Sequence, residues 1–487
     1  MRLQFTAGAV GPGGAPAVRQ SRTGGNTVGP LLDFSVTDQA LLFSFYALSA
    51  MAVLFLFLRA GLLPRPARKR PQAGEAGDPA PQPPQSPQLP GRRRWIVTAA
   101  LAAAAGALAG AVALVVCEML LNVFGLPLDP DTRVWVICAF AGLGLALVSL
   151  WRSRWWRKAA AVVASLLFVA TAALGINAGY GLNPTLGAML GINQAKHLTL
   201  PKLNPAAQTQ TATVLWKSWT PPAGMPDAGQ GGSVTIPADA SGFHARDAFL
   251  YLPPAALVDN PPPLPIIIMM MGQPGGPEQS KTAVQELDSF ARQNHGLAPL
   301  LLTVDQLGNP YKNPVCVDSA KGNVYTYVTT DVVNYIRKNL NVASDRTQWA
   351  VAGYSNGGEC ALSFAAKRPE IFGSLLDISG ELEPVDGTAA NTVKTVFGGN
   401  QAAFTAEKPA TILKAHKYTD ELAIFTSGAL DSKYGPQSAW AEKDAKAAGM
   451  TTYRFVGPGI GHRGDAVGYG LHAGLPLLFQ RFGLAPS

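Results

Sequence analysis

Four long apolar stretches in the first half of the chain constrain its fold more than any other feature. They cover Gln39 to Leu58, Trp95 to Leu121, Val134 to Trp151 and Ala159 to Ile176. Because a helix rises about 1.5 Å per residue, each stretch is long enough to cross a hydrocarbon layer of about 30 Å. One such stretch could be a buried core helix, but four in succession predict a membrane region of four transmembrane helices. In the second stretch, Gly106 and Gly110 predict a small-residue face for contact with another helix.

Basic residues between these stretches predict how the membrane region is oriented. One group lies between the first and second stretches and another between the third and fourth: Arg65, Arg68, Lys69, Arg70, Arg92, Arg93 and Arg94, and then Arg152, Arg154, Arg157 and Lys158. Cytoplasmic loops of membrane proteins are rich in Lys and Arg, so both segments are expected in the cytoplasm. The segment between the second and third stretches carries Asp129 and Asp131 instead, which suits the outer side. The chain after the fourth stretch should then lie outside the cytoplasmic membrane.

The net charge of +8 comes largely from these basic groups, which can bind anionic lipid head groups, and it is not a sign of nucleic-acid binding. The lipid bilayer is therefore the predicted partner, and the pattern predicts no oligomeric state. Residues 64–90 are rich in Pro and Gln and lack apolar side chains for a core, which indicates a disordered cytoplasmic loop. The predicted organisation is a tail, the membrane region, a linker and a second domain, at residues 1–37, 38–178, 179–211 and 212–487.

The second domain contains the sequence Gly-Tyr-Ser-Asn-Gly at residues 353–357, which has the Gly-x-Ser-x-Gly spacing of a nucleophile elbow. Residues 347–351 predict a strand before it, and residues 361–366 predict a helix after it. A sharp turn from strand to helix is the context that this motif needs, because it holds the serine clear of its own backbone. The bare pattern can occur by chance in a chain with 51 glycines, but this context favours Ser355 as a catalytic serine.

A serine nucleophile needs a base that takes its proton. Of the three histidines that follow Ser355, His462 comes directly after a predicted strand, in a glycine-rich loop. We predict that His462 is the base; the alternative is a loop histidine that faces solvent. His472 is expected to be structural, at the start of the last helix, and His416 is expected on a solvated helix face between lysines.

The base in turn needs an acid to orient it. Asp431 follows a predicted strand at residues 421–428 and lies between Ser355 and His462 along the chain, in the order found in α/β-hydrolases. The competing carboxylates are Glu381 and Glu383, which follow the preceding apolar run. We favour Asp431, whose alternative role is that of an ordinary loop-capping aspartate.

Two backbone N–H groups are needed to stabilise the oxyanion of the tetrahedral intermediate. In the α/β-hydrolase arrangement, one belongs to the residue after the nucleophile, here Asn356, and one to a loop after an earlier strand. Residues 265–271 predict a buried strand that runs into a glycine-rich loop, so Gly272 and Gln273 are the candidates for the second group. The three methionines of that strand could suggest a soft-metal site, but on a continuous apolar strand they are expected to be core. No metal or other cofactor is predicted.

The four cysteines divide by location. Cys117 and Cys138 lie within apolar stretches, where a packed thiol is expected. Cys316 and Cys360 lie in the second domain, where an oxidising exterior would permit a disulfide between them, although spacing alone does not establish it.

Strands and helices alternate along the second domain, as a mostly parallel sheet requires. Helices are predicted at residues 282–293 and 325–340, and strands at residues 300–304, 375–379, 422–427 and 452–456, in addition to the elbow strand and helix. Active sites of such sheets lie beyond the carboxyl ends of the strands. All the candidate residues fall at such ends.

Three segments of the second domain resemble the actinobacterial esterases related to esterase D and to the mycolyltransferase (antigen 85) group. They are residues 241–254, the elbow at residues 353–357, and Gly461 with His462. The resemblance implies an α/β-hydrolase fold, a serine acyl-enzyme, and ester or acyl-transfer chemistry without a metal. The acid of the mycolyltransferases is a glutamate, whereas the best-placed residue here is Asp431, and a membrane region precedes the domain.

These observations predict a multi-pass membrane serine esterase whose catalytic domain lies outside the cytoplasmic membrane. Ser355 would attack an acyl or aminoacyl ester, and a site held close to the bilayer favours lipid-linked esters of the cell envelope. An acyltransferase that passes the acyl group to a sugar or lipid hydroxyl is the alternative enzyme. A membrane scaffold that uses a hydrolase fold only for binding is the alternative outside catalysis.

Overall fold

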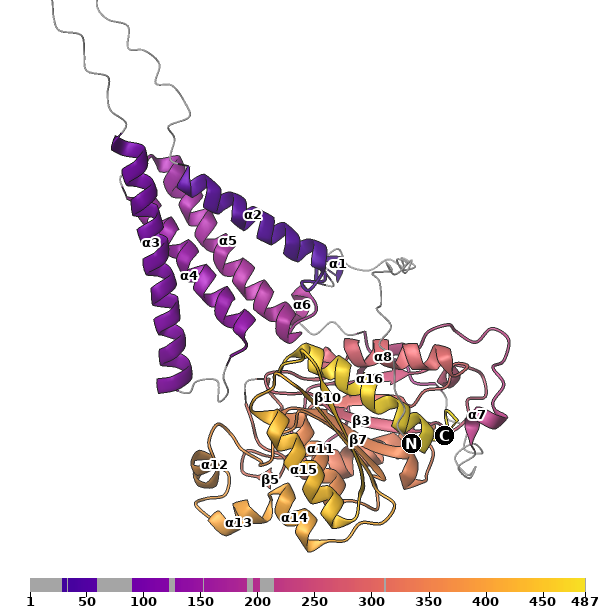
Figure 1. The fold of residues 1–487 in the computed structure, drawn as a ribbon. Coiled ribbons are helices and arrows are strands. Elements are labelled where there is room, and N and C mark those ends of the chain that lie inside the picture. The colour runs from indigo at the N-terminus through magenta and orange to yellow at the C-terminus, as the bar shows by residue number, and fades with distance from the viewer. Residues whose placement is uncertain are drawn as a thin grey trace, which may run out of the picture.

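The computed structural model describes residues 29–32, 34–58, 90–121, 128–151, 153–190, 196–201, 214–310 and 312–486. Most of the predicted tail and nearly all of the predicted loop at residues 64–90 therefore lie outside the described residues, as do residues 191–195 and 202–211 of the predicted linker. Within them, the chain forms a group of long helices that lies against one edge of an α/β domain (Figure 1).

The long helices coincide with the four apolar stretches. They are α2 (Gln39–Phe57), α3 (Pro90–Val115) with a π-helical end (Val116–Leu120), α4 (Pro130–Leu150) and α5 (Trp155–Tyr180). All four are long and apolar enough to cross a membrane. Large apolar side chains point outward from them, such as Leu101 and Leu166, which are 65% and 68% exposed. An apolar outer surface of this extent fits contact with lipid rather than with water.

Glycines let α3 and α4 approach each other closely. A Cβ atom on Gly106 would lie 2.2 Å from the carbonyl oxygen of Phe140, and one on Gly110 would lie 2.9 Å from the Cβ of Phe140. On the other helix, a Cβ on Gly144 would lie 2.3 Å from the carbonyl oxygen of Ala102. The helix contact predicted at Gly106 and Gly110 is therefore present, and larger side chains there would force the helices apart.

The two cysteines of the helical part are free thiols. Cys117 is half-buried, whereas Cys138 is exposed on the outer surface of α4. The expectation of a packed thiol is thus wrong for Cys138, because α4 turns that side chain away from its neighbours.

The α/β domain is built on an eight-stranded sheet with the order β1-β2-β4-β3-β7-β8-β9-β10. Its strands are β1 (Gln230–Val234), β2 (Ala248–Leu252), β3 (Ile266–Met270), β4 (Leu300–Val304), β7 (Trp349–Tyr354), β8 (Ser374–Ile378), β9 (Leu422–Gly428) and β10 (Thr451–Gly457). β2 pairs antiparallel with β1 and β4, and all other neighbours are parallel. The sheet is therefore mostly parallel, as predicted.

Helices cover both faces of the sheet (Figure 1). α8 (Lys281–Gln293) and α16 (Gly464–Arg481) contact each other, and α11 (Asn356–Lys367), α14 (Pro409–Ala415) and α15 (Tyr434–Ala448) form a second contacting group. The predicted helix at residues 325–340 is divided into α9 (Val324–Thr326), a π-helical segment (Tyr327–Val332) and α10 (Val333–Asn339). The shorter elements are α1 (Gly29–Leu32), α6 (Leu186–Met189), α7 (Leu215–Ser218), α12 (Ala389–Thr395), α13 (Gln401–Ala406), β5 (Asp318–Ser319) and β6 (Gly322–Asn323).

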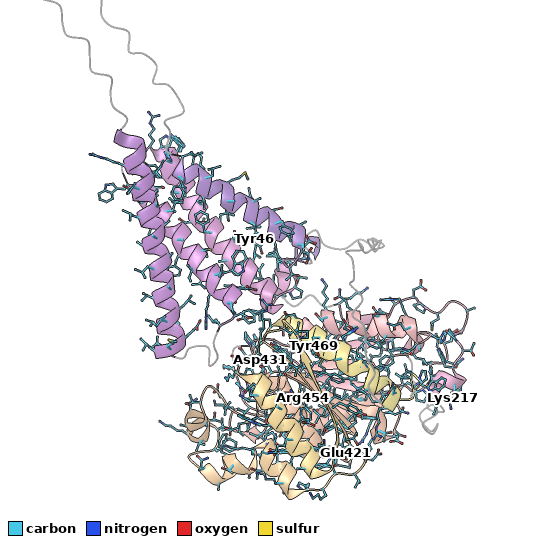
Figure 2. The ribbon with its side chains drawn as sticks, in the orientation of Figure 1. Tyr46, Lys217, Glu421, Asp431, Arg454 and Tyr469 are labelled. Carbon is cyan, nitrogen blue, oxygen red and sulfur yellow. A yellow bond between two sulfur atoms is a disulfide. The ribbon has the colours of Figure 1, made fainter. Side chains whose placement is uncertain are left out.

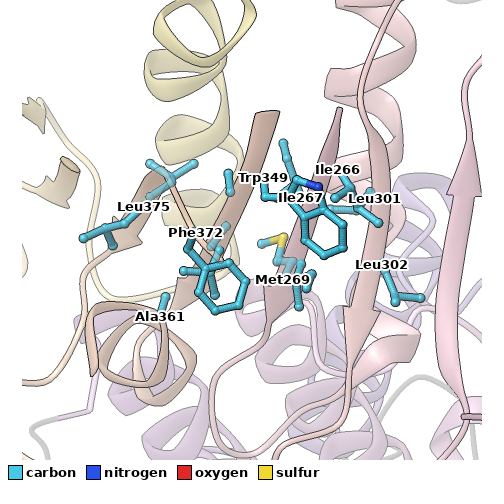
Figure 3. Close-up of a cluster of buried hydrophobic side chains, with 14 of the residues drawn as sticks. Ile266, Ile267, Met269, Leu301, Leu302, Trp349, Ala361, Phe372 and Leu375 are labelled. Atoms are coloured by element: carbon cyan, nitrogen blue, oxygen red, sulfur yellow. The ribbon is translucent and has the colours of Figure 1, made fainter. Parts of the chain in front are cut away.

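The centre of the sheet is the core of the domain. Every residue of β3 is fully buried, including Ile266, Ile267 and Met269, which pack with Trp349 and Leu301 of the neighbouring strands (Figure 3). A parallel strand covered by helices on both faces must be apolar on both sides, which explains its continuous apolar sequence. The methionines of this strand are therefore core residues, as predicted.

The helical part meets the domain at the carboxyl edge of the sheet. The Gln279 side chain donates hydrogen bonds to the carbonyl oxygens of Gly181 and Leu182, each at 3.3 Å, just beyond the end of α5. Arg463, at the start of α16, pairs with Asp129 and Asp131 at the start of α4. Parallel strands place their carboxyl ends at this edge, so the long helices lie beside the predicted site.

Candidate active site

Ser355 occupies a strained turn between β7 and α11. Its φ of 56° and ψ of −117° lie outside the regions that residues with a side chain normally adopt. A Cβ on Gly353 would lie 1.9 Å from the carbonyl oxygen of Gly357, and one on Gly357 would lie 2.2 Å from that of Met270. Both glycines of the motif are therefore required for the turn, which has the geometry of a nucleophile elbow.

The predicted base contacts this serine, and the predicted acid contacts the base. His462, in the loop after β10, has its Nε2 at 2.9 Å from Ser355 Oγ. Its Nδ1 lies 2.8 Å from Oδ2 of Asp431, in the loop after β9. Asp431 also accepts a hydrogen bond from the Tyr434 amide at 2.9 Å. The structure thus brings together the three residues that the sequence analysis selected as a possible triad.

The competing acids point elsewhere. Glu381 accepts a hydrogen bond from the Tyr434 hydroxyl at 3.3 Å, and Glu383 pairs with Lys408 at 2.6 Å. Burial raises the pKa of Glu381 to about 7. Burial also acts to raise the pKa of Asp431, but the hydrogen bonds with His462 and the Tyr434 amide outweigh it and hold that pKa below its ordinary value. Asp431 is therefore the carboxylate that stays ionised beside the imidazole.

Two tyrosine rings hold the imidazole of His462. The Tyr354 ring stacks on it with centroids 5.1 Å apart, and the Tyr434 ring lies 4.3 Å away. Both were missed from the sequence: Tyr354 occupies a variable position of the elbow motif, and Tyr434 opens a helix with no motif of its own. Packing from two rings limits rotation of the imidazole and so preserves its contact with Ser355.

The candidate oxyanion groups lie around Ser355. Asn356 is the first residue of α11, and its backbone N–H has no hydrogen-bond acceptor among the described residues. Its side chain is held by Gln306 at 3.1 Å and Asn313 at 3.4 Å. A Cβ on Gly272 would lie 3.2 Å from the Cβ of Ser355, and Gly272 and Gln273 line the same cavity as the serine. The three candidates are therefore close to the nucleophile, at the positive end of a helix.

Arg246 anchors the loop that carries Gly272 and Gln273. Its guanidinium donates to the carbonyl oxygen of Gly275 at 2.7 Å and to both oxygens of the buried Asp305, at 2.8 and 3.0 Å. A paired Arg and Asp with this many hydrogen bonds form a rigid support. Arg246 lies in one of the segments on which the family resemblance rests, although its supporting role could not be read from sequence.

Cys316 and Cys360 form a disulfide that joins the loop after β4 to α11. Glu359 lies beside it, fully buried, and neither of its carboxylate oxygens has a hydrogen-bond partner among the described residues. Burial raises the pKa of Glu359 well above its ordinary value. The three side chains are close enough to resemble a metal-ligand set, but the two sulfur atoms are bonded to each other and are not free thiolates.

The remaining predicted histidines lie away from Ser355. His472 lies in the middle of α16 rather than at its start, is exposed, and pairs with Glu286 at 3.3 Å. His416 is exposed, as predicted, but it lies just beyond the last residue of α14 rather than on a helix face.

Comparison with known proteins identifies the family. The family model described as "Putative esterase" matches residues 244–459. An uncharacterized protein of Corynebacterium glutamicum is 35% identical over 379 residues, which cover 74% of this chain and 84% of that protein. The chain belongs to the putative esterase family. It is a serine ester hydrolase of the α/β-hydrolase type.

Solved structures resemble the catalytic domain of this esterase at low identity. An S-formylglutathione hydrolase from Agrobacterium tumefaciens is 17% identical, with a TM-score of 0.45, and the match covers 53% of this chain and 97% of that one. A ferulic acid esterase is 15% identical, with a TM-score of 0.44, over 52% of this chain and 99% of that one.

A cavity of about 1270 Å³ opens beside Ser355 in the esterase. Side chains of the catalytic domain line it, among them Tyr354, Glu381 and His462. Residues at the start of α4 and the end of α5 line it as well. Figure 2 shows Asp431 on the side of the domain that faces the long helices. The site is therefore shared between the two parts of the chain.

Proposed function

We propose that this esterase is inserted in the cell membrane and hydrolyses carboxylic esters, acyl or aminoacyl, of cell-envelope lipids through Ser355, His462 and Asp431. The observation that carries the catalytic assignment is the position of His462, hydrogen-bonded to Ser355 Oγ on one side and to Asp431 on the other. This is the arrangement by which a serine hydroxyl becomes a nucleophile at neutral pH.

In the proposed reaction, Ser355 Oγ attacks the ester carbonyl carbon while His462 Nε2 takes the hydroxyl proton. The N–H of Asn356, with that of Gly272 or Gln273, stabilises the negative oxygen of the tetrahedral intermediate. The intermediate collapses as His462 returns the proton to the departing alcohol, which leaves an acyl-enzyme. Water, deprotonated by the same imidazole, then attacks the acyl carbon and releases the acid and free Ser355. Asp431 holds His462 in the required tautomer throughout.

The membrane part of the proposal rests on the four long apolar helices and on their place next to the site. A catalytic domain tethered in this way meets esters of lipids at high local concentration. The acidic segment before α4 and the basic residues of the other loops favour the outer side for the domain.

The test is labelling with a fluorophosphonate probe together with turnover of a short acyl ester, using the full chain in detergent. Ser355→Ala should abolish both labelling and turnover while the protein remains folded. Asp431→Asn should lower kcat by roughly three to four orders of magnitude, as loss of the orienting acid does in other triads, whereas Glu381→Gln should cost far less. Turnover that survives Ser355→Ala would refute the mechanism. A larger loss of kcat from Glu381→Gln than from Asp431→Asn would assign the role of the acid to Glu381.

A further inference from the structure

The cavity beside Ser355 has one wall that does not belong to the catalytic domain. Thr132 and Val136, in the first turns of α4, and Ile176 and Gly179, in the last turns of α5, line it. At about 1270 Å³ the cavity also exceeds the roughly 300–1,000 Å³ typical of sites for small ligands. A compact ester would leave much of this wall without contact.

The lining changes character from one set of elements to another. The loop after β8 and the start of α15 supply the polar Glu381, Lys433 and Gln437 as well as the apolar Leu382, Val385 and Trp440. The described lining residues of α4 and α5 carry no charge and are mainly apolar, such as Val136 and Ile176. A cavity with a polar part and an apolar part fits an amphiphile, whose head group and hydrocarbon chain need different surroundings.

Gly179 leaves the apolar part open. A Cβ atom built on Gly179 would meet no heavy atom within 4 Å. One turn earlier, a Cβ on Gly175 would lie 2.6 Å from the Trp135 ring. The first glycine therefore faces free space that belongs to the cavity, while the second serves close packing.

The wall is fixed relative to the nucleophile. The Gln279 side chain holds the carbonyl oxygens of Gly181 and Leu182 at 3.3 Å, directly after α5. Arg463, next to His462, pairs with Asp129 Oδ2 at 3.2 Å, directly before α4. Both ends of the wall are thus tied to elements that carry the site.

We propose that the start of α4 and the end of α5 bind a hydrocarbon chain of the ester. The chain lies in the space that Gly179, which has no side chain, leaves open. The inference rests on the proposed function and adds to it the surface that selects the substrate. When a lipid ester group moves from the bilayer to Ser355, its chain leaves hydrocarbon surroundings. The apolar wall replaces those surroundings and spares the chain exposure to water.

The test fills the space at Gly179 and measures chain-length preference. Gly179→Phe and wild type are compared in the same detergent on p-nitrophenyl esters from acetate to decanoate, and on alkyl acetates from methyl to decyl. The first series carries the chain on the acyl side and the second on the alcohol side. Relative to wild type, kcat/KM of the variant should be nearly unchanged for the shortest esters. In one of the two series, kcat/KM of the variant should fall at least tenfold for the ester with the ten-carbon chain.

Two further variants serve as a control and as an independent test. Val163→Phe introduces the same ring on an outward position of α5, which is 64% exposed, and should leave the preference unchanged. Val136→Phe obstructs the same wall from α4 and should repeat the effect of Gly179→Phe. Chain-length profiles that match wild type in both series for both obstructing variants would overturn the inference. The proposed function would survive that result, because hydrolysis of acetate esters that requires Ser355 tests it separately.

Discussion

At the scale of single residues, carboxyl groups near the site are buried without a basic partner among the described residues to neutralise them. Asp377, at the end of β8, is 1% exposed and accepts the Gly380 amide at 2.7 Å. Its second oxygen has no hydrogen-bond partner in the described part of the chain. Burial raises the pKa of Asp377 from 3.8 to about 7. The folded protein therefore binds a proton at Asp377 over a pH range in which the unfolded chain has released it.

This pKa predicts a pH-dependent effect of Asp377→Asn. Because the pKa of Asp377 is raised in the folded state, its bound proton contributes fully to stability below about pH 4. This contribution is lost as the pH rises through about 7. Asparagine keeps the acceptor for Gly380 but has no proton to lose. The melting temperature of Asp377→Asn minus that of wild type should therefore be more positive at pH 8 than at pH 5.

Thermal unfolding of the full chain in detergent at both pH values measures this difference. The exposed Asp259→Asn serves as the control and should give the same small difference at pH 5 and pH 8. Burying the asparagine amide lowers the stability of the variant by the same amount at both pH values. The predicted quantity is therefore the change in the melting-temperature difference between pH 5 and pH 8. An equal difference at both pH values would contradict the assignment.

At the scale of elements, the loop that carries His462 is tied to the start of α4 through Arg463. The guanidinium contacts Asp129 Oδ2 at 3.2 Å, Asp131 Oδ2 at 2.5 Å and Asp465 Oδ2 at 3.1 Å. The side chain of Asp129 is 16% exposed and that of Asp131 is 71% exposed. Solvent-exposed ion pairs contribute little free energy, so the pair with Asp129 should account for most of the attachment of the His462 loop to α4.

We predict that Asp129→Asn lowers kcat for a short ester about three- to tenfold, whereas Asp131→Asn lowers it less than twofold, since 1.4 kcal/mol corresponds to a tenfold change. KM should change little, because the loss acts on the position of His462. Steady-state kinetics on the full chain provide the measurement. Asp420→Asn, which removes an ion pair with Arg481, is the matched control and should leave kcat unchanged. A larger effect of Asp131→Asn than of Asp129→Asn would refute the ranking.

At the scale of the whole molecule, the charges of the segments between the long helices predict that the catalytic domain lies on the outer side of the membrane. We predict that a cysteine introduced at the exposed Asp227 reacts with a membrane-impermeant maleimide in intact cells. A cysteine at Gly74, between the first two apolar stretches, should react only after permeabilisation. Both reporters are placed in a chain whose free Cys117 and Cys138 are replaced by alanine. Labelling of Gly74→Cys alone would place the catalytic domain in the cytoplasm.

Local patterns of sequence were sufficient for the four long helices and for the parallel strands of the sheet. They did not predict β1 and β2, nor the division of the helix expected at residues 325–340. Apolar length predicted the four long helices, and the predicted strands agree with the observed ones to within one residue at each end, except the elbow strand. That strand was predicted at residues 347–351 and is observed at Trp349–Tyr354. The elbow was predictable because a strand, a strained serine and a helix follow one another directly along the chain. Such features depend on contacts between near neighbours along the chain, and a sequence displays these directly.

Contacts between distant residues were decided by the tertiary structure. Sequence order left Asp431 and Glu381 as rival acids, and only the adjacency of β9 and β10 brings Asp431 to within 2.8 Å of His462. The Cys316–Cys360 disulfide and the two tyrosine rings around His462 likewise join separate segments. No pattern in the sequence indicated that α4 and α5 would line the cavity beside Ser355. That arrangement follows from how two separately formed parts pack, and packing depends on the shapes of complete surfaces rather than on any local run of residues.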